Sequence, residues 1–225
     1  MPSPNPVNPN KFRLVATILF TTTAVALLVG RAVGWLPFTW LETFGSITGA
    51  ACVLLVVWGR VWNFPVGIAS SLAYLVFFGQ GKLYADAGLQ IVFILLAIHG
   101  WIAWKRTRQV VVPIRRVPLG ELTVLAVLFP LVWFGLTWLL QTVGGAAPLL
   151  DAFVTTASLI SQWLLNRRYI ESWLGWIAVD QVSVALFWSR EMYLTAGLYA
   201  VFLGMCVAGL LAWRRQLTPI DGSIP

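Results

Sequence analysis

The chain is divided into long apolar segments separated by short polar stretches. Each segment approaches the length of about 20 residues that an α-helix needs to cross the hydrocarbon core of a bilayer. The pattern therefore predicts an all-α integral membrane protein with eight transmembrane helices. The predicted spans lie at about 14–35, 41–58, 64–80, 86–104, 120–141, 150–166, 172–189 and 193–213.

The basic residues between these spans indicate the orientation of the protein. Twelve Lys and Arg fall on the side that holds both termini, and three (Arg31, Lys82 and Arg190) fall on the other side. Positive residues are enriched in cytoplasmic loops, so we expect both termini in the cytoplasm. Omitting one helix would scramble this split, which supports the count of eight.

The chain also contains an internal repeat. Residues 42–106 align with 151–215 at a shift of 109 without a gap. The matched pairs include Phe44 with Phe153, Tyr84 with Tyr193 and Trp104 with Trp213. Each copy holds three spans and one span lies between them, so both copies enter the membrane from the same side. The predicted order is an extra helix (14–35), a first three-helix repeat (41–106), a linker helix (120–141) and a second three-helix repeat (150–215).

The two ends of the chain lie outside this core. The first ten residues contain four Pro and three Asn, and residues 1–13 are predicted to form a disordered leader. The apolar run that follows Lys11 and Arg13 resembles a signal peptide, but no small-x-small cleavage site follows it cleanly. We therefore interpret it as a retained first helix, and we assign residues 216–225 to a cytoplasmic tail.

Composition agrees with a membrane protein and excludes several classes of function. The sequence is 59% hydrophobic and 10% charged, whereas a soluble domain has about 25% charged residues. The net charge of +7 is carried by short loops and chain ends, which is typical of topology signals and not of nucleic-acid binding. Cys52 and Cys206 fall inside apolar spans, as expected of buried small side chains. No Walker, HExxH, GxSxG or GxGxxG motif is present, so we expect no enzyme activity, no cofactor and no metal.

Asp180 is the most informative polar residue because it falls near the middle of a predicted span. A charged group at membrane depth costs at least a few kcal/mol unless it has a partner or water, and no Lys or Arg lies inside a span to pair with it. Trp173, Trp176, Asp180 and Ser183 share one helical face. Indoles beside a carboxylate suit a cationic, ring-bearing ligand.

Other polar residues inside the spans have competing interpretations. Gln162 ends a polar stripe on the sixth span, which either faces a ligand or bonds a neighbouring helix. Gln90 lies one turn into the fourth span, where its amide needs partners, and we favour ligand contact. Asn63 precedes the third span, a position typical of a helix N-cap. His99, the sole histidine, is expected to form ordinary hydrogen bonds and no metal site.

Several motifs together resemble the PnuC family of bacterial vitamin transporters. They are Asn63-x3-Gly67, Leu83-Tyr84-Ala85-Asp86 with Leu89-Gln90, Gly100-Trp101-x2-Trp104, and Glu171-x-Trp173-x2-Trp176-x3-Asp180. The resemblance covers about 41–215 and implies a SWEET-like fold in the bacterial inner membrane. It also implies facilitated diffusion of nicotinamide riboside, which a cytoplasmic kinase then traps by phosphorylation. The alternatives are thiamine or another vitamin on the same fold and, from other classes, a membrane receptor or an intramembrane enzyme.

The resemblance also implies roles for individual residues. Trp173 and Trp176 would flank the nicotinamide ring, while Gln90 and Asn63 would reach the ribose or the amide. The full set expected to bind substrate is Trp173, Trp176, Asp180, Gln90, Gln162, Asn63 and Tyr84. The chain departs from the family at Ser172, Ser70 and Asp180, where relatives often have Asn, so a shifted ligand stays open. The oligomeric state also stays open.

Overall fold

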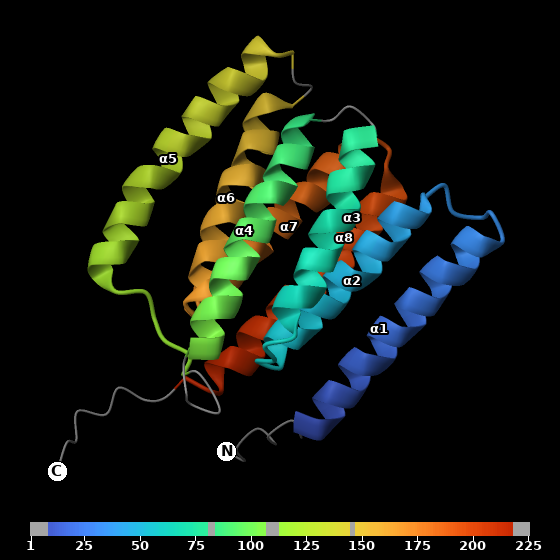
Figure 1. Cartoon of the computed structure of the whole chain (residues 1–225), viewed down its shortest axis with the longest axis horizontal. Helices are drawn as coiled ribbons and strands as arrows, with labels where there is room; N and C mark the ends of the chain where they lie inside the picture. Colours follow the sequence, from blue (N-terminus) through green and yellow to red (C-terminus); the bar gives the residue numbers. More distant parts are fainter. Residues whose placement is uncertain (1–8, 81–83, 107–112, 145–146, 218–225) are drawn as a thin grey trace, which may run out of the picture.

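The computed structural model describes residues 9–80, 84–106, 113–144 and 147–217, and its described residues form eight α-helices (Figure 1). The helices are α1 (Pro9–Ala32), α2 (Trp40–Val57), α3 (Asn63–Gln80), α4 (Tyr84–Arg106), α5 (Leu119–Thr142), α6 (Pro148–Asn166), α7 (Ser172–Ser189) and α8 (Tyr193–Arg214). The predicted all-α fold is therefore confirmed. Helix α1 already begins at Pro9, inside the segment expected to be a disordered leader. Most of the predicted cytoplasmic tail lies outside the described residues.

Local sequence signals fix several helix ends. Thr39 and Glu42 form a capping box at the start of α2, in which each side chain accepts a hydrogen bond from the backbone N–H of the other residue. Pro148 occupies the first turn of α6, where its missing N–H costs nothing. Gly59, with φ of +66°, follows the end of α2, a conformation that favours glycine.

Length and composition mark five of the described helices as apolar enough to cross a membrane. These stretches are Trp40–Val57, Ala87–Lys105, Leu119–Thr142, Pro148–Asn166 and Thr195–Arg214. Helix α1 contributes a shorter apolar stretch, Phe20–Ala32. Helices α3 and α7 fall outside this set, since polar residues such as Asn63 and Gln80 in α3 and Asp180 and Gln181 in α7 lower their mean hydropathy. They occupy equivalent positions in the two repeats.

Six helices of the two repeats form a closed ring. In the described part of the chain, α3 packs between α2 and α4, and α7 packs between α6 and α8. The ring is completed by contacts of α4 with α6 and of α2 with α8. The repeat exchanges these two contacts, because it matches α2 with α6 and α4 with α8. This is the arrangement expected for parallel repeats related by an axis along the membrane normal.

The remaining two helices also occupy equivalent places. Helix α1 contacts α2, and helix α5 contacts the equivalent helix α6, and the two flank the ring on opposite sides (Figure 1). The predicted extra helix and linker helix therefore correspond to each other, so each half of the chain has one flanking helix and one repeat. Helix α1 begins and α8 ends at the same end of the bundle (Figure 1), as an even number of spans requires.

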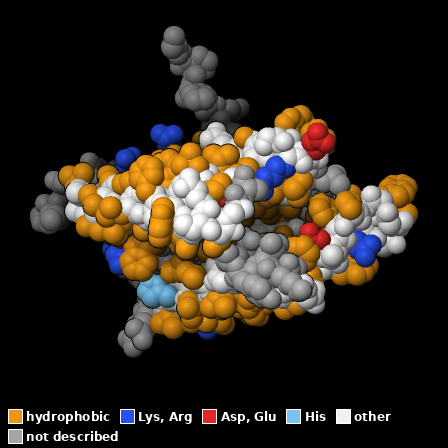
Figure 2. Space-filling model, turned by 90° about the horizontal axis from the view of Figure 1, so that it is seen from above, with side chains coloured by type: hydrophobic (Ala, Val, Ile, Leu, Met, Phe, Trp, Pro, Cys, Tyr) orange, Lys and Arg blue, Asp and Glu red, His pale blue; other side chains and the backbone are white. Residues whose placement is uncertain are grey.

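The outer surface matches a lipid environment. Figure 2, which views the bundle from above, shows many apolar side chains among polar and backbone atoms, with charged side chains as isolated spots. Large apolar residues are strongly exposed along α5, including Leu131 at 65% and Trp138 at 68%. In a membrane such side chains face acyl chains, so their exposure carries no penalty.

Each repeat is packed internally by the same aromatic unit. In the first repeat, Phe64 and Trp104 meet edge to face with ring centroids 5.0 Å apart, and Gly100 gives Phe64 room to approach. In the second repeat, Trp173 and Trp213 meet edge to face at 5.4 Å, and the equivalent Gly209 gives Trp173 room. Edge-to-face geometry is favourable for aromatic pairs. The duplication therefore extends from sequence to packing.

This packing predicts different effects for two glycines on α8. A Cβ at Gly209 would lie 2.5 Å from the Trp173 ring, whereas a Cβ at Gly204 would meet nothing within 4 Å. Gly209→Ala should therefore destabilise the protein by about 1–3 kcal/mol, because overpacking forces the helices apart. Gly204→Ala is the matched control and should be neutral or slightly stabilising. Thermal unfolding in detergent measures both, and equal melting temperatures would contradict the account of the repeat core.

Candidate functional site

Trp176 and Asp180 lie together on α7, next to α8. Trp176 is half-buried and packs against the cluster that contains Cys206. Asp180 is 4% exposed, and the Cys206 thiol is its hydrogen-bonding neighbour. The second carboxylate oxygen, Oδ2, is buried and has no hydrogen-bond partner among the described residues. The structure thus encloses a carboxylate in protein and leaves part of its bonding capacity unused.

An unsatisfied buried carboxylate oxygen needs a physical explanation. Buried polar groups in native proteins are nearly always hydrogen-bonded, and the exceptions point to strain, to function or to a missing ligand. In the described residues no Lys or Arg forms a salt bridge with Asp180. A cationic ligand next to the Trp176 indole would supply the missing countercharge. A carboxylate and an indole at this depth can therefore recognise a positively charged ring.

Trp173 occupies a different environment from Trp176, although both were expected to flank the ligand. Trp173 is 1% exposed and is enclosed by Gly209 and Trp213 of α8. Its role in this conformation is to pack the second repeat. Trp176 is therefore the better candidate of the two for contact with a ligand.

Asn63 has the position and the bonding of a structural residue. It opens α3, is 2% exposed, and donates a hydrogen bond from its side-chain amide to the Arg60 carbonyl at 2.7 Å. The backbone carbonyl of Asn63 accepts a hydrogen bond from the Cys52 thiol at 3.2 Å. These bonds tie the turn between α2 and α3 to α2.

Gln162 is engaged at the contact between the repeats. Its amide donates to Asn166 Oδ1 at 3.0 Å on the same helix, and the Asn166 amide donates to the Leu96 carbonyl of α4 at 2.8 Å. The Trp104 indole also donates to the Asn166 carbonyl at 2.9 Å. The helix-bonding interpretation of Gln162 is thus supported by its contacts, and Asn166 is the residue that links the two repeats.

Gln90 and Tyr84 complete the expected set. Gln90 is half-buried on α4, and its repeat counterpart is Tyr199 of α8. Tyr84 opens α4, but its side chain lies outside the described residues. The structure therefore places Trp176 and Asp180 on the same face of α7. Asn63 and Gln162 form hydrogen bonds within the protein. No contact of Gln90 distinguishes a role in ligand binding from a structural role.

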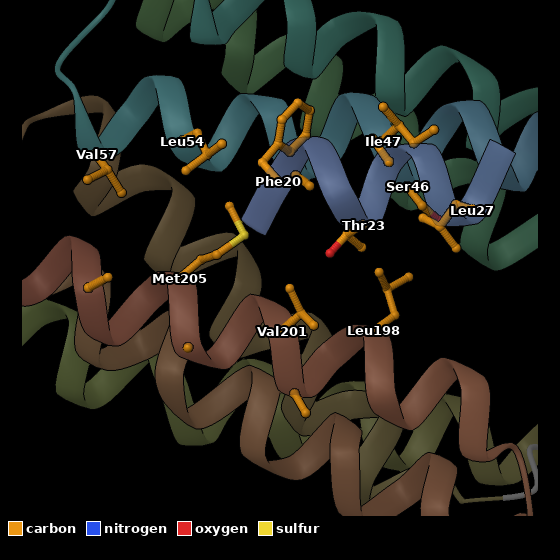
Figure 3. A pocket seen from close by; sticks show the side chains of 15 residues that line it. Phe20, Thr23, Leu27, Ser46, Ile47, Leu54, Val57, Leu198, Val201 and Met205 are labelled. Carbon is orange, nitrogen blue, oxygen red and sulfur yellow. The ribbon is translucent and has the colours of Figure 1, made fainter. Parts of the chain in front are cut away.

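A hollow among the described residues lies elsewhere. It has a volume of about 340 Å³ and is formed where α1, α2 and α8 meet (Figure 3). Figure 3 shows mostly apolar side chains around it, among them Phe20, Leu54 and Met205. None of the expected substrate-binding residues lines this hollow. Its place outside the six-helix ring and its apolar walls suit lipid acyl chains better than a polar ligand.

Three residues that organise the end of the bundle near the termini were not predicted from the sequence. Glu121 accepts hydrogen bonds from Trp163, Arg167 and Tyr169 and thereby attaches α5 to α6. Asn166 links α4 to α6 as described above. Arg168, counted in the sequence as a topology signal, is 2% exposed and lies over the Trp104 and Trp213 rings. Among the described residues, no three metal-binding side chains gather into a metal site.

Comparison with known proteins identifies relatives that cover most of the chain. The model of a family described as "Nicotinamide mononucleotide transporter" matches residues 39–215. The nicotinamide riboside transporter PnuC of Escherichia coli K12 is 24% identical over 86% of this chain and 93% of its own length. The riboflavin/roseoflavin transporter RibM of Streptomyces davaonensis is 25% identical, covering 83% of this chain and 92% of its own.

A solved structure shares the same fold. The crystal structure of the vitamin B3 transporter PnuC superposes with a TM-score of 0.71 and covers 92% of this chain and 96% of its own. Its sequence identity to this chain is 21%. The eight helices and their repeat thus match a known transporter architecture.

The different environments of the two tryptophans on α7 predict different stabilities. Trp173→Ala should lower the melting temperature strongly, because removing a fully buried indole costs about 3 kcal/mol or more. Trp176→Ala should lower it much less, since its side chain is half-buried. Thermal unfolding in detergent without ligand provides the comparison. If both substitutions destabilise equally, Trp176 belongs to the scaffold as Trp173 does.

Proposed function

The chain belongs to the nicotinamide mononucleotide transporter family, and we propose that it carries nicotinamide riboside across the cytoplasmic membrane of a bacterium. Members of this family are multi-pass membrane transporters and not enzymes. Several curated relatives carry nicotinamide riboside transporter in their names, those of Escherichia coli and Haemophilus influenzae among them. Physical support for this substrate comes from α7.

The observation that carries the proposal is the buried Oδ2 of Asp180, which has no hydrogen-bond partner among the described residues and lies about one helical turn from Trp176 on α7. Nicotinamide riboside contains a pyridinium cation, which would provide the missing countercharge for the carboxylate. A cation next to an indole gains about 0.5–2 kcal/mol. Asp180 has Ser71 as its repeat counterpart, so the site we propose is asymmetric and oriented by one half of the ring.

The same carboxylate disfavours the mononucleotide that gives the family its name. A phosphate monoester carries nearly two negative charges at neutral pH and needs Arg, Lys or backbone N–H donors. The sequences of α2, α3, α6 and α7 contain no Lys or Arg. The phosphorylated form would therefore meet a negative charge without a compensating positive one.

Riboflavin is the second candidate, because one relative carries that name. Its ring system is neutral, so it would leave Asp180 uncompensated, or would require that the carboxyl group be protonated. Thiamine, in contrast, is cationic and fits the same charge argument as nicotinamide riboside. Binding of all three vitamins to the purified protein therefore tests the substrate directly.

We further propose uniport into the cytoplasm with both termini on the cytoplasmic side. The distribution of Lys and Arg, twelve against three, supports this orientation. A cation moving inward alone gains about 2.3 kcal/mol per 100 mV of inside-negative potential. No coupled ion is then needed, and phosphorylation by a cytoplasmic riboside kinase would trap the product.

Asp180→Asn tests the proposed countercharge. The substitution should weaken nicotinamide riboside binding about tenfold or more, since loss of roughly 1.4 kcal/mol corresponds to a factor of ten. Binding of neutral riboflavin, if it is measurable, should not weaken. Quenching of tryptophan fluorescence in the purified protein gives both affinities.

Asp151→Asn is the matched control for that experiment. Asp151 lies at the start of α6 and pairs with Arg190 at 3.7 Å, away from α7's central turns. The Asp151→Asn substitution should leave the affinity for nicotinamide riboside unchanged. Unchanged affinity in Asp180→Asn would remove Asp180 from the site, and failure of every vitamin to bind would refute the substrate proposal as a whole.

The proposed uniport also predicts a response to voltage. Vesicles that contain the protein and no kinase should accumulate nicotinamide riboside when an inside-negative potential of about 100 mV is imposed, because that potential favours inward cation movement. Radiolabelled uptake at zero and at negative potential gives the comparison. Equal uptake at the two potentials would indicate that a compensating charge moves with the substrate.

A further inference from the structure

Arg168 lies where the two repeats meet at the end of the bundle near the termini. It belongs to the turn between α6 and α7 and adopts φ of 57°. Its repeat counterpart is Gly59, in the equivalent turn between α2 and α3, with φ of 66°. A Cβ on Gly59 would lie 3.1 Å from Nη2 of Arg168. A side chain that touches its own repeat counterpart lies on the axis that relates the repeats.

Two equivalent tryptophans enclose the guanidinium. Arg168 Cζ lies over the Trp104 ring at 4.6 Å from its centroid and over the Trp213 ring at 5.3 Å. The repeat matches these two tryptophans with each other, and they are 3% and 0% exposed. One cation therefore fills a cage to which each repeat contributes one indole. The fully buried rings of Phe64 and Trp173 pack edge to face against Trp104 and Trp213 respectively.

This cage holds its cation without a strong partner. Arg168 forms no salt bridge with any described residue, and its buried Nε has no hydrogen-bond partner among them. The indole N–H groups of Trp173 and Trp213 are also buried and unpartnered there. Burial lowers the pKa of the Arg168 guanidinium to about 10, so the side chain remains charged at neutral pH. A buried cation held mainly by aromatic faces is poorly compensated for its lost hydration.

We propose that Arg168 is the gating residue at the cytoplasmic end of the pathway, closing it in this conformation and withdrawing when substrate leaves. This inference rests on the proposed transport function and orientation. The substrate site of a duplicated carrier lies between its repeats, so a side chain on the repeat axis blocks the exit from it. A pyridinium that moves toward the cytoplasm meets the same two indole faces and can replace the guanidinium there. The exchange of one cation for another keeps the cage occupied while Arg168 moves out toward water.

Cys206 provides a reporter on the inner side of this gate. It lies seven residues before Trp213 on α8, about two helical turns deeper in the bundle. It is 4% exposed and borders Asp180. The chain has two cysteines, so Cys52→Ala leaves Cys206 as the single thiol. The measurement is the rate at which a small cationic methanethiosulfonate reagent, added to the cytoplasmic face of inside-out vesicles, labels Cys206.

Arg168→Ala in this background should label at least about tenfold faster than the parent, a factor that corresponds to 1.4 kcal/mol. Arg167→Ala is the matched control: Arg167 also stacks on a tryptophan, Trp163 at 4.5 Å, but it is exposed and lies off the axis. It should label at the parent rate. Equal rates for Arg168→Ala and the parent, or an equal acceleration in Arg167→Ala, would overturn the proposal.

A second pair of variants keeps the proposal testable if Arg168→Ala does not fold. Arg168→Lys keeps a cation that can occupy the cage, whereas Arg168→Gln keeps a polar side chain without charge. Arg168→Lys should label more slowly than Arg168→Gln, and equal rates would contradict a cation gate. The labelling uses no substrate, so it tests the gate even if the binding experiments reject nicotinamide riboside.

Discussion

A carboxylate at membrane depth imposes the constraint on which the rest of the structure depends. Asp180 must be kept from lipid, because a charge in hydrocarbon costs several kcal/mol or more. The six-helix ring meets this requirement by placing α7 between α6 and α8 and closing the repeats at two equivalent contacts. Apolar residues then face outward, and many buried polar residues lie on the ring helices α2, α3, α6 and α7. An open arrangement of the same helices would expose Asp180 or leave its α7 face without neighbours.

The duplication supplies the scaffold, and departures from it supply the asymmetric residues. Both repeats share the aromatic–glycine–tryptophan unit that packs them. The second repeat replaces small or apolar residues by larger polar or aromatic ones: Ser71 by Asp180, Gly67 by Trp176, Gly59 by Arg168 and Val57 by Asn166. At the axis this asymmetry is a steric necessity, because two equivalent arginines would compete for one position. A single guanidinium against a glycine fits.

Much of the fold could be predicted from the sequence, and less of the site. The lengths of the apolar segments and the distribution of Lys and Arg between them predict eight helices. The alignment of the chain with itself at a shift of 109 predicts the repeat. These features can be read directly along the sequence. The bond from Asn166 to Leu96 of α4 and the enclosure of Trp173 by α8 could not be predicted, since both depend on which neighbour each helix faces. The inward orientation of Arg168 could not be predicted for the same reason. Its sequence context is that of a topology signal, but its side chain lies on the repeat axis.

We propose that Asp180 selects a cationic ring. The most direct measurement compares wild-type affinity for nicotinamide riboside with affinity for its reduced dihydro form, which has nearly the same shape and no ring charge. Competition for tryptophan quenching in the purified protein gives both values under one condition. We expect the cationic form to bind about tenfold or more tightly than the reduced form, which corresponds to at least 1.4 kcal/mol. Equal affinities for the two forms would contradict it.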